Sequence, residues 1–208
     1  MKRLAFVFVF LALVSTALMA QAPRGWQLRV DGSTDASDPD RPGTIQFMAM
    51  GGGFHVVAPQ AGVFWNPANT MTGPYTLKGQ FTMLKPSSHP NYYGLVFGGS
   101  AIEGAAQRYT YFLVAQNGTF ILKERNGANV RDIVARTQHA SVRRPDAGGR
   151  SVNDLEVRVG ADKVDYVING TVVHSAPKDA NLRTDGVYGF RVNHDLEVQV
   201  NGLSATKS

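Results

Sequence analysis

Apolar and polar residues alternate along several short stretches of this chain. The clearest are residues 155–159, Leu-Glu-Val-Arg-Val, and residues 196–200, Leu-Glu-Val-Gln-Val. A period of two residues places all the apolar side chains of such a stretch on one face of a β-sheet. No window of eleven or more residues carries an apolar stripe with a period of 3.6 residues. The pattern therefore predicts strands rather than amphipathic helices.

Two Asn-Gly dipeptides divide strand-like stretches and predict tight hairpin turns, because Asn and Gly accept the positive φ that these turns require. Asn117-Gly118 separates residues 109–116 from 119–125. A two-residue turn at this position pairs Tyr111 with Glu124 and Tyr109 with Asn126.

The second dipeptide, Asn169-Gly170, separates residues 164–168 from 171–175. The same counting pairs Ile168 with Thr171 and, further along, Asp165 with His174. An acid beside an imidazole is the arrangement of a catalytic dyad. However, Asp165 should share its sheet face with Arg158 and Glu156, which favours a solvated group of ion pairs.

The other apolar runs complete a set of about a dozen short strands. They are expected at residues 45–50, 54–57, 75–84, 92–97, 131–137 and 186–192. Short strands separated by turns rich in Gly predict an all-β fold, a two-sheet antiparallel β-sandwich of the jelly-roll type. Residues 31–43 and 141–151 are expected to be long loops, and residues 21–208 to form a single domain.

The first twenty residues have the pattern of a signal peptide. Met1-Lys2-Arg3 is basic, the apolar run Leu4 to Val14 follows, and small residues lead to Ala20. We expect cleavage near Ala20 and a secreted or periplasmic product. No later apolar run is long enough to span a bilayer.

Charge and cysteine content exclude some classes of function. The formal net charge is +5, and it falls to +3 without Lys2 and Arg3, because residues 1–20 contain no acid. The remaining basic residues are scattered, so nucleic-acid binding has little support. The chain contains no cysteine, so the exported product must rely on its core rather than on disulfides.

The order of several strand and turn motifs carries a family resemblance. The motifs are Tyr-Gly-Leu-Val-Phe-Gly at 93–98, Tyr-Thr-Tyr-Phe-Leu-Val at 109–114, Asn-Gly-Thr-Phe at 117–120, Asn-Asp-Leu at 153–155, Ile-Asn-Gly at 168–170 and Asp-Gly-Val-Tyr-Gly-Phe at 185–190. Over residues 43–203 the chain resembles the concanavalin A-like superfamily, in particular laminin G-like and 3-keto-disaccharide hydrolase-like domains of secreted bacterial proteins. The resemblance implies two stacked sheets, with carbohydrate bound on the concave face or its rim.

One departure from this superfamily bears on catalysis. Glycosidases of the laminarinase type carry Glu-x-Asp-x-x-Glu on one strand, and this chain has no such triplet; the nearest fragments are Asp154-Leu155-Glu156 and Asp195-Leu196-Glu197. The expected function is therefore a secreted, non-catalytic carbohydrate-binding or surface-interaction module. A glycoside-processing hydrolase and a structural envelope protein are the alternatives.

Sugar binding needs flat aromatic faces beside polar groups, because pyranose rings present apolar C–H patches ringed by hydroxyls. The candidate ligand-binding residues are Trp65, Tyr92, Tyr93, Tyr109, Tyr111, Glu124, Arg125 and His194. Both faces of residues 109–116 are apolar, so the alternation does not tell which face is the inner one.

No cofactor motif is present, and calcium is the one metal considered. Asp31, Asp35, Asp38 and Asp40 stand close together in one expected loop, and hard cations take several oxygen ligands. Their spacing is not that of a calcium-binding EF-hand loop, and Asp beside Ser, Gly and Pro is also ordinary turn chemistry.

Overall fold

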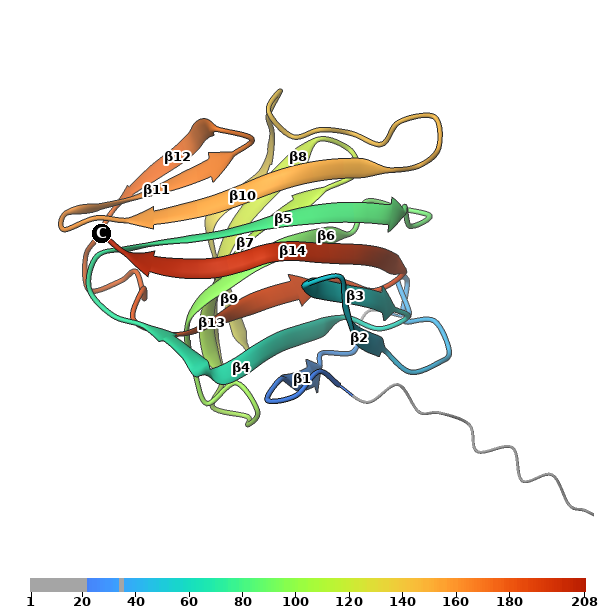
Figure 1. The fold of residues 1–208 in the computed structure, drawn as a ribbon, viewed down its shortest axis with the longest axis horizontal. Coiled ribbons are helices and arrows are strands. Elements are labelled where there is room, and N and C mark those ends of the chain that lie inside the picture. Colours follow the sequence, from blue (N-terminus) through green and yellow to red (C-terminus); the bar gives the residue numbers. More distant parts are fainter. Residues whose placement is uncertain (1–21, 34–35) are drawn as a thin grey trace, which may run out of the picture.

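The computed structural model describes residues 22–33 and 36–208. These residues form two antiparallel sheets of seven strands each, and Figure 1 shows the two sheets stacked on each other. Sheet A runs in the order β1-β4-β13-β6-β7-β8-β9, and sheet B in the order β12-β11-β10-β5-β14-β3-β2. The strands of sheet A are β1 (Gln27–Val30), β4 (Gly62–Met71), β6 (Tyr92–Ser100), β7 (Arg108–Ala115), β8 (Thr119–Asn126), β9 (Asn129–Gln138) and β13 (Gly186–Val192). The strands of sheet B are β2 (Gln46–Met50), β3 (Gly53–Ala58), β5 (Tyr75–Lys85), β10 (Ser151–Val159), β11 (Lys163–Ile168), β12 (Thr171–Pro177) and β14 (Leu196–Lys207).

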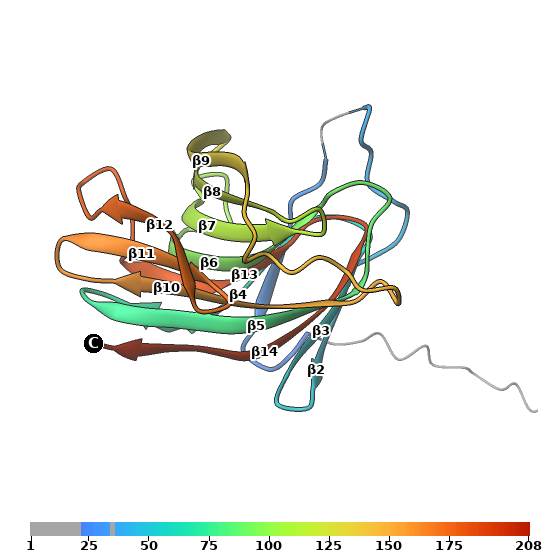
Figure 2. The same cartoon turned by 90° about the horizontal axis from the view of Figure 1, so that it is seen from above.

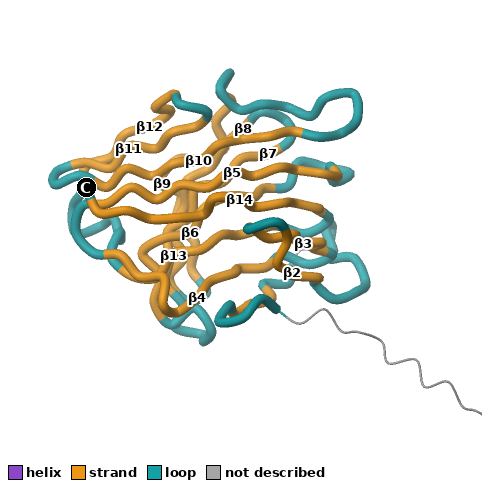
Figure 3. The backbone as a smooth tube through the Cα atoms, viewed as in Figure 1, coloured by secondary structure: helices purple, strands orange, loops and turns teal. Residues whose placement is uncertain are grey.

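The predicted all-β sandwich is confirmed. Figure 3 shows strands joined by loops and turns, and none of the described residues forms a helix that could cross a bilayer. The expected signal peptide, residues 1–20, lies outside the described residues. Its cleavage and the division of the chain into a leader and a single domain stay predictions.

Strand prediction missed β1 and β4. The run of β4 contains Asn66, Pro67 and Asn69, which are depleted in strands. The structure accommodates them because β4 pairs regularly with β13 only on either side of this segment, at Trp65 and at Thr70. Pro67 therefore lies outside that ladder, where no hydrogen bond requires the N–H that proline lacks.

The core between the sheets is rich in aromatic rings. Phe64 of β4 and Phe190 of β13 stack with their centroids 4.7 Å apart, and Phe47 of β2 packs edge-on against Phe64 at 4.8 Å. Tyr166 of β11 meets Phe112 of β7 at 5.3 Å. These rings come from both sheets, so they fix how the two layers stack.

The outer face of sheet A is also apolar. A second cluster of buried side chains covers it, with members from β4, β6, β7 and β8; these are Val63, Trp65, Tyr92, Val96, Ile102, Tyr109, Tyr111, Leu113, Ala115 and Ile121. The loop after β6 contributes Ile102, and Arg29 of β1 holds that loop by donating to the carbonyls of Ile102, Glu103 and Gly104 at 3.4, 3.1 and 3.0 Å. This loop therefore folds back over the sheet.

Sheet A is strongly curved, and its outer face is concave. Asp31 follows β1 and Arg125 lies in β8, five strand positions away, which would be about 24 Å in a flat sheet at about 4.8 Å per strand. Their side chains nevertheless lie 3.2 Å apart. In Figure 2, β7, β8 and β9 bend away from sheet B, and the loop after β1 rises on the same side.

The first hairpin has a different register from the predicted one. Tyr111 pairs with Lys123 and Tyr109 with Arg125, not with Glu124 and Asn126. Gly118 has a φ of 86°, whereas Asn117 does not have a positive φ, and the loop is one residue longer than a two-residue turn. A slip of one residue moves every side chain of the strand to the other face.

The second hairpin follows the prediction at its turn and departs from it further along. Ile168 pairs with Thr171, and both turn residues have positive φ, 50° at Asn169 and 82° at Gly170. A β-bulge then shifts the register, so Asp165 faces Ser175 and bonds to it at 2.6 Å. The predicted pairing of Asp165 with His174 is wrong, which removes the candidate dyad.

Asp165 belongs to a group of solvated ion pairs, as the favoured interpretation expected. It stands opposite Arg158 in the pairing of β11 with β10 and forms an ion pair with Lys163 at 2.9 Å. Arg158 in turn pairs with Glu156 at 2.8 Å. These contacts lie on the outer face of sheet B, where such pairs contribute little stability.

We predict that Gly118→Val destabilises the protein by about 1–3 kcal/mol, because a β-branched residue resists positive φ. The free energy of unfolding in urea measures this cost. Gly104→Ala is the control: Gly104 has no positive φ and its added Cβ would meet nothing closer than 3.9 Å. Equal stability of the two variants would contradict the assigned turn.

Candidate functional site

A cavity opens on the concave face of sheet A. Its volume is about 440 Å³, and it is lined by Tyr92, Tyr111, Leu113, Ile121, Lys123, Asp132, Ala135, Arg136, Arg191 and Asn193. Strands β6, β7, β8, β9 and β13 supply all of these residues except Asn193, which directly follows β13, so rigid elements rather than loops form most of the wall. The lining combines aromatic rings with an amide and four charged groups.

An ion-pair network lies beside the cavity and joins distant parts of sheet A. Arg191 of β13 donates from Nη1 to Asp31 Oδ2 at 2.6 Å, and Arg125 donates from Nη2 to Asp31 Oδ1 at 3.2 Å. Arg191 Nη1 also lies 3.3 Å from the Tyr109 hydroxyl, and its guanidinium stands 5.7 Å from the centroid of the Tyr111 ring. The side chains of Asp31 and Arg191 are only 11% and 13% exposed, so both charges depend on each other for compensation.

The surroundings of these groups shift their pKa values. Burial works to raise the pKa of Asp31, but Arg191, with Arg125 and Arg29, outweighs it and holds the pKa of that carboxyl below its ordinary value. Burial raises the pKa of Tyr111 to about 12, although Arg191 acts in the opposite direction. Tyr111 therefore keeps its proton at neutral pH and is unsuited to act as a general base.

Five of the predicted ligand-binding residues lie on the concave face. Tyr92 and Tyr111 line the cavity. Tyr109 is fully buried beneath Arg191, and Arg125 holds Asp31. Trp65 lies under Ile102 in the same apolar cluster and is only 3% exposed, so its ring faces protein rather than solvent.

The other three predicted residues lie elsewhere. Tyr93 is buried between the sheets, where its hydroxyl meets Ser151 at 3.3 Å. Glu124 faces away from the cavity because of the register slip and pairs with Arg131 at 2.6 Å. His194 lies in the loop between β13 and β14, with Asp38 and Asp40.

Sequence reasoning missed most of the polar wall of the cavity, namely Lys123, Asp132, Arg136, Arg191 and Asn193. A signal for two of them exists in the alternation of β13. Phe190 and Val192 point into the core, so Arg191 and Asn193 must point to the other face. Lys123 was missed because the predicted register of the first hairpin paired Tyr111 with Glu124 instead of with Lys123.

A second depression, about 390 Å³, lies on the outer face of sheet B and contains two carboxylates, Asp154 and Glu156. Asp154 accepts a hydrogen bond from Gln80 at 3.0 Å, and Glu156 holds Arg158 through two hydrogen bonds. Neither carboxylate is buried, and both already have partners. The two carboxylates are thus engaged with Gln80 and Arg158, whereas glycoside hydrolysis needs an acid and a base that face the substrate.

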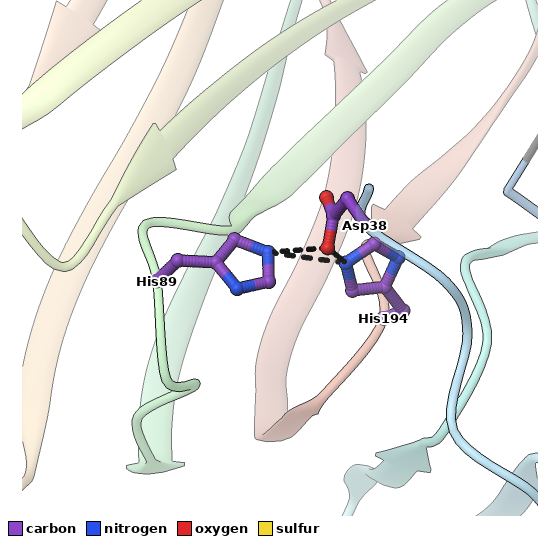
Figure 4. A group of neighbouring side chains, drawn as sticks. All are labelled: Asp38, His89 and His194. Carbon is purple, nitrogen blue, oxygen red and sulfur yellow. Dashed lines mark hydrogen bonds and ion pairs between the residues drawn. The ribbon is translucent and has the colours of Figure 1, made fainter. Parts of the chain in front are cut away.

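Residues that could hold a metal ion gather at one end of the sandwich. Asp38, His89 and His194 offer ligand atoms that all lie within 4.8 Å of one another, and Figure 4 shows the three side chains pointing toward a common centre. Of the aspartates considered for calcium, only Asp38 belongs to this group, with Asp40 behind it. Asp31 lies in the arginine network instead, and Asp35 lies outside the described residues.

Comparison with known proteins identifies the fold. No protein-family model and no curated protein sequence matches the chain. Among solved structures, the carbohydrate-binding module CBM66 from Bacillus subtilis superposes with a TM-score of 0.59 at 10% identity, covering 88% of this chain and 96% of that one. A family 7 alginate lyase, A1-II′, in complex with substrate gives 0.56 at 14% identity, covering 88% and 93%.

A third structure, a Bacillus subtilis protein of unknown function with a galectin-like fold, gives a TM-score of 0.52 at 14% identity, covering 88% of this chain and 89% of that one. At these identities the likeness concerns the fold alone. The sandwich is a concanavalin A-like jelly roll, as the motif order indicated.

We predict that Asp31→Asn destabilises the protein by about 3 kcal/mol at pH 7, because the change leaves Arg191 buried without a counter-charge. A carboxyl with a lowered folded pKa contributes stability above its unfolded pKa, and this contribution is lost as the pH falls through the folded pKa. The difference from the parent should therefore be largest at neutral pH, shrink as the pH falls below the ordinary value of 3.8, and vanish only below the lowered pKa of the folded state.

Melting curves of both proteins between about pH 2 and pH 7 test this expectation. Glu156→Gln, which removes one partner of an exposed ion pair on sheet B, is the control and should cost less than about 1 kcal/mol. A loss for Asp31→Asn that does not change with pH would contradict the assigned role of the charge.

Proposed function

We propose that this concanavalin A-like sandwich is an exported carbohydrate-binding protein that holds an acidic polysaccharide on the concave face of sheet A. The observation that carries the proposal is the cavity of about 440 Å³, where two tyrosines meet three basic side chains. Tyr92 and Tyr111 offer aromatic surface, and Lys123, Arg136 and Arg191 offer donors and positive charge.

The charge balance of the cavity favours an acidic ligand over a neutral one. Of the three cationic side chains in its lining, Lys123 pairs with Asp132 at 3.0 Å and Arg191 pairs with Asp31 at 2.6 Å, whereas no described carboxylate pairs with Arg136. Arg136 is exposed and extends the basic surface to the rim. Guanidinium groups bind carboxylates in a planar, two-pronged geometry, which suits the uronate groups of an acidic polysaccharide.

The network beside the cavity supports the same ligand chemistry. Asp31 already occupies a cradle formed by Arg191 and Arg125, so this face recognises a carboxylate within the protein itself. A second carboxylate, carried by a sugar, would find Lys123 and Arg136 nearby. The fold likeness to a carbohydrate-binding module and to an alginate lyase is compatible with this choice.

Binding without catalysis is the form of the proposal that the site chemistry supports. Tyr111 keeps its proton at neutral pH, and Asp132 and Asp31 are both engaged with cations. A general acid and base of matched pKa are the usual needs of glycan cleavage. We further propose export from the cell, on the pattern of residues 1–20.

We predict that the double variant Lys123→Ala/Arg136→Ala binds a uronate polysaccharide such as alginate at least tenfold more weakly, while its melting temperature stays close to that of the parent. Both side chains are at least partly exposed, so their loss opens no core volume. Affinity electrophoresis at low and high salt measures the effect, and salt should weaken binding by the parent more than by the variant.

The control is Arg158→Ala/Lys163→Ala, which removes the same charge from the outer face of sheet B. Equal weakening by both double variants would mean that general charge, not this cavity, binds the polysaccharide. Release of unsaturated or reducing products during the same incubation would favour an enzyme and overturn the non-catalytic form of the proposal.

We predict that Tyr111→Ala weakens polysaccharide binding and costs less stability than Tyr93→Ala. Tyr93 fills the core between the sheets, where truncation costs about 3–5 kcal/mol. Tyr111 lines the cavity and is 8% exposed, so neighbouring side chains and water can adjust around it. Melting temperature and affinity measured together test this, and a Tyr111→Ala variant with unchanged binding would exclude this ring as a ligand contact.

A further inference from the structure

We propose that Asp38, His89 and His194 form a binding site for one divalent transition-metal ion, of which Zn²⁺ is the representative. The three residues come from three loops, those joining β1 to β2, β5 to β6 and β13 to β14. The loops meet at one end of the sandwich, and Figure 4 shows the two imidazoles and the carboxylate converging.

The distances between the ligand atoms match the edges of a coordination polyhedron. Asp38 Oδ1 lies 2.9 Å from His89 Nε2 and 3.1 Å from His194 Nε2, and the two nitrogens lie 3.3 Å apart. Bonds of about 2.0–2.1 Å to zinc give edges of about 3.3–3.4 Å in a tetrahedron and about 2.9 Å in an octahedron. An ion can therefore contact all three atoms without movement of the backbone.

The rings of both histidines have a polar partner on the side away from the centre. His194 Nδ1 lies 3.2 Å from Asp40 Oδ1, and His89 Nδ1 lies 3.3 Å from Ser88 Oγ. A partner of this kind on the second ring nitrogen typically orients a metal-binding histidine. The Nε2 atoms of both rings therefore face Asp38.

Asp195 holds the three loops in place and so prepares the site. Its carboxylate accepts from the backbone N–H of Ser88 at 3.2 Å, beside His89, and pairs with Arg41 at 2.8 Å, in the loop of Asp38. Asp195 directly follows His194 in the chain. One side chain thus ties together the loops that carry all three ligands, which lowers the ordering cost of binding.

The ligand set selects the class of ion. Two imidazole nitrogens and one carboxylate suit Zn²⁺ and its first-row neighbours, whereas Ca²⁺ prefers six to eight oxygens. Asp38 and Asp40 supply negative charge to balance the ion. The side chain of His89 is 41% exposed and that of His194 only 10%, so an ion has access from solvent on the His89 side.

The test uses the untagged chain after signal-peptide removal, stripped with a chelator and titrated with Zn²⁺ in a calorimeter. We expect one equivalent to bind and to raise the melting temperature, because an ion bound only by the folded state stabilises it. His89→Ala should abolish this stoichiometric binding without unfolding the protein, since the side chain of His89 is 41% exposed and fills no core volume. Asp40→Asn should weaken binding by about 10–100-fold, as loss of a carboxylate behind a histidine ligand does.

His174→Ala, which removes a half-exposed histidine on β12, is the matched control and should bind Zn²⁺ like the parent. Substitution with Co²⁺ provides a spectroscopic check, because its visible absorption reports nitrogen and oxygen ligands directly. Failure of the parent to bind Zn²⁺, equal binding by His89→Ala, or a stability gain from Ca²⁺ but not from Zn²⁺ would each overturn the proposal.

Discussion

Sheet A is apolar on both faces, and the rest of the structure depends on the burial of both. All residues of β6 except the last, and all residues of β7 except the first, are buried. Sheet B covers the inner face through the aromatic core, but residues 22–33 and 36–208 provide no third layer over the outer face. Sheet A curves instead, so that its own strands and the loops after β1 and β6 bury the outer face. The concave cavity is what this closure leaves open.

Curvature also explains why the polar groups of the concave face are so closely paired. Bringing β1 toward β8 removes Asp31 and Arg191 from bulk water, where an isolated charge is costly. Each charge then requires its partner, and the network of Asp31, Arg191 and Arg125 joins strands that are not neighbours in the sheet. The network contains two arginines for one carboxylate, which suits the acidic ligand that we propose.

The cavity and the histidine cluster share one short connection, the loop from β13 to β14. Asn193 lines the cavity and donates its backbone N–H to Tyr92 at 2.9 Å, and the next residue, His194, points into the cluster. Occupation of the cluster by an ion would therefore fix the end of β13 that carries Arg191 and Asn193. None of the described residues in the strands of sheet B lines the cavity or belongs to the histidine cluster. The outer face of sheet B carries solvated ion pairs, in keeping with the strict alternation of β10.

The sequence by itself determined the class of fold, most strands and the faces of sheet B. Alternation in residues 155–159 and 164–168 was enough to place Asp165 on the same sheet face as Arg158, because one face of that sheet meets water and only one register buries the apolar side chains. The motif order was enough to indicate the concanavalin A-like fold.

Tertiary structure decided the features that the two-residue alternation of apolar and polar side chains does not encode. Both faces of β7 are apolar, so sequence could not tell that Tyr111 faces the cavity and that Tyr93 of β6 faces the core. One extra loop residue at Gly118 brought Lys123 and Arg125 to the tyrosine face in place of Glu124. Asp38, His89 and His194 are separated by dozens of residues, and only the meeting of three loops at one end of the sandwich brings them within coordination distance. Contacts between distant strands of a curved sheet, and between loops at one end of the sandwich, depend on where segments far apart in the sequence meet. The local alternation of apolar and polar residues does not contain that information.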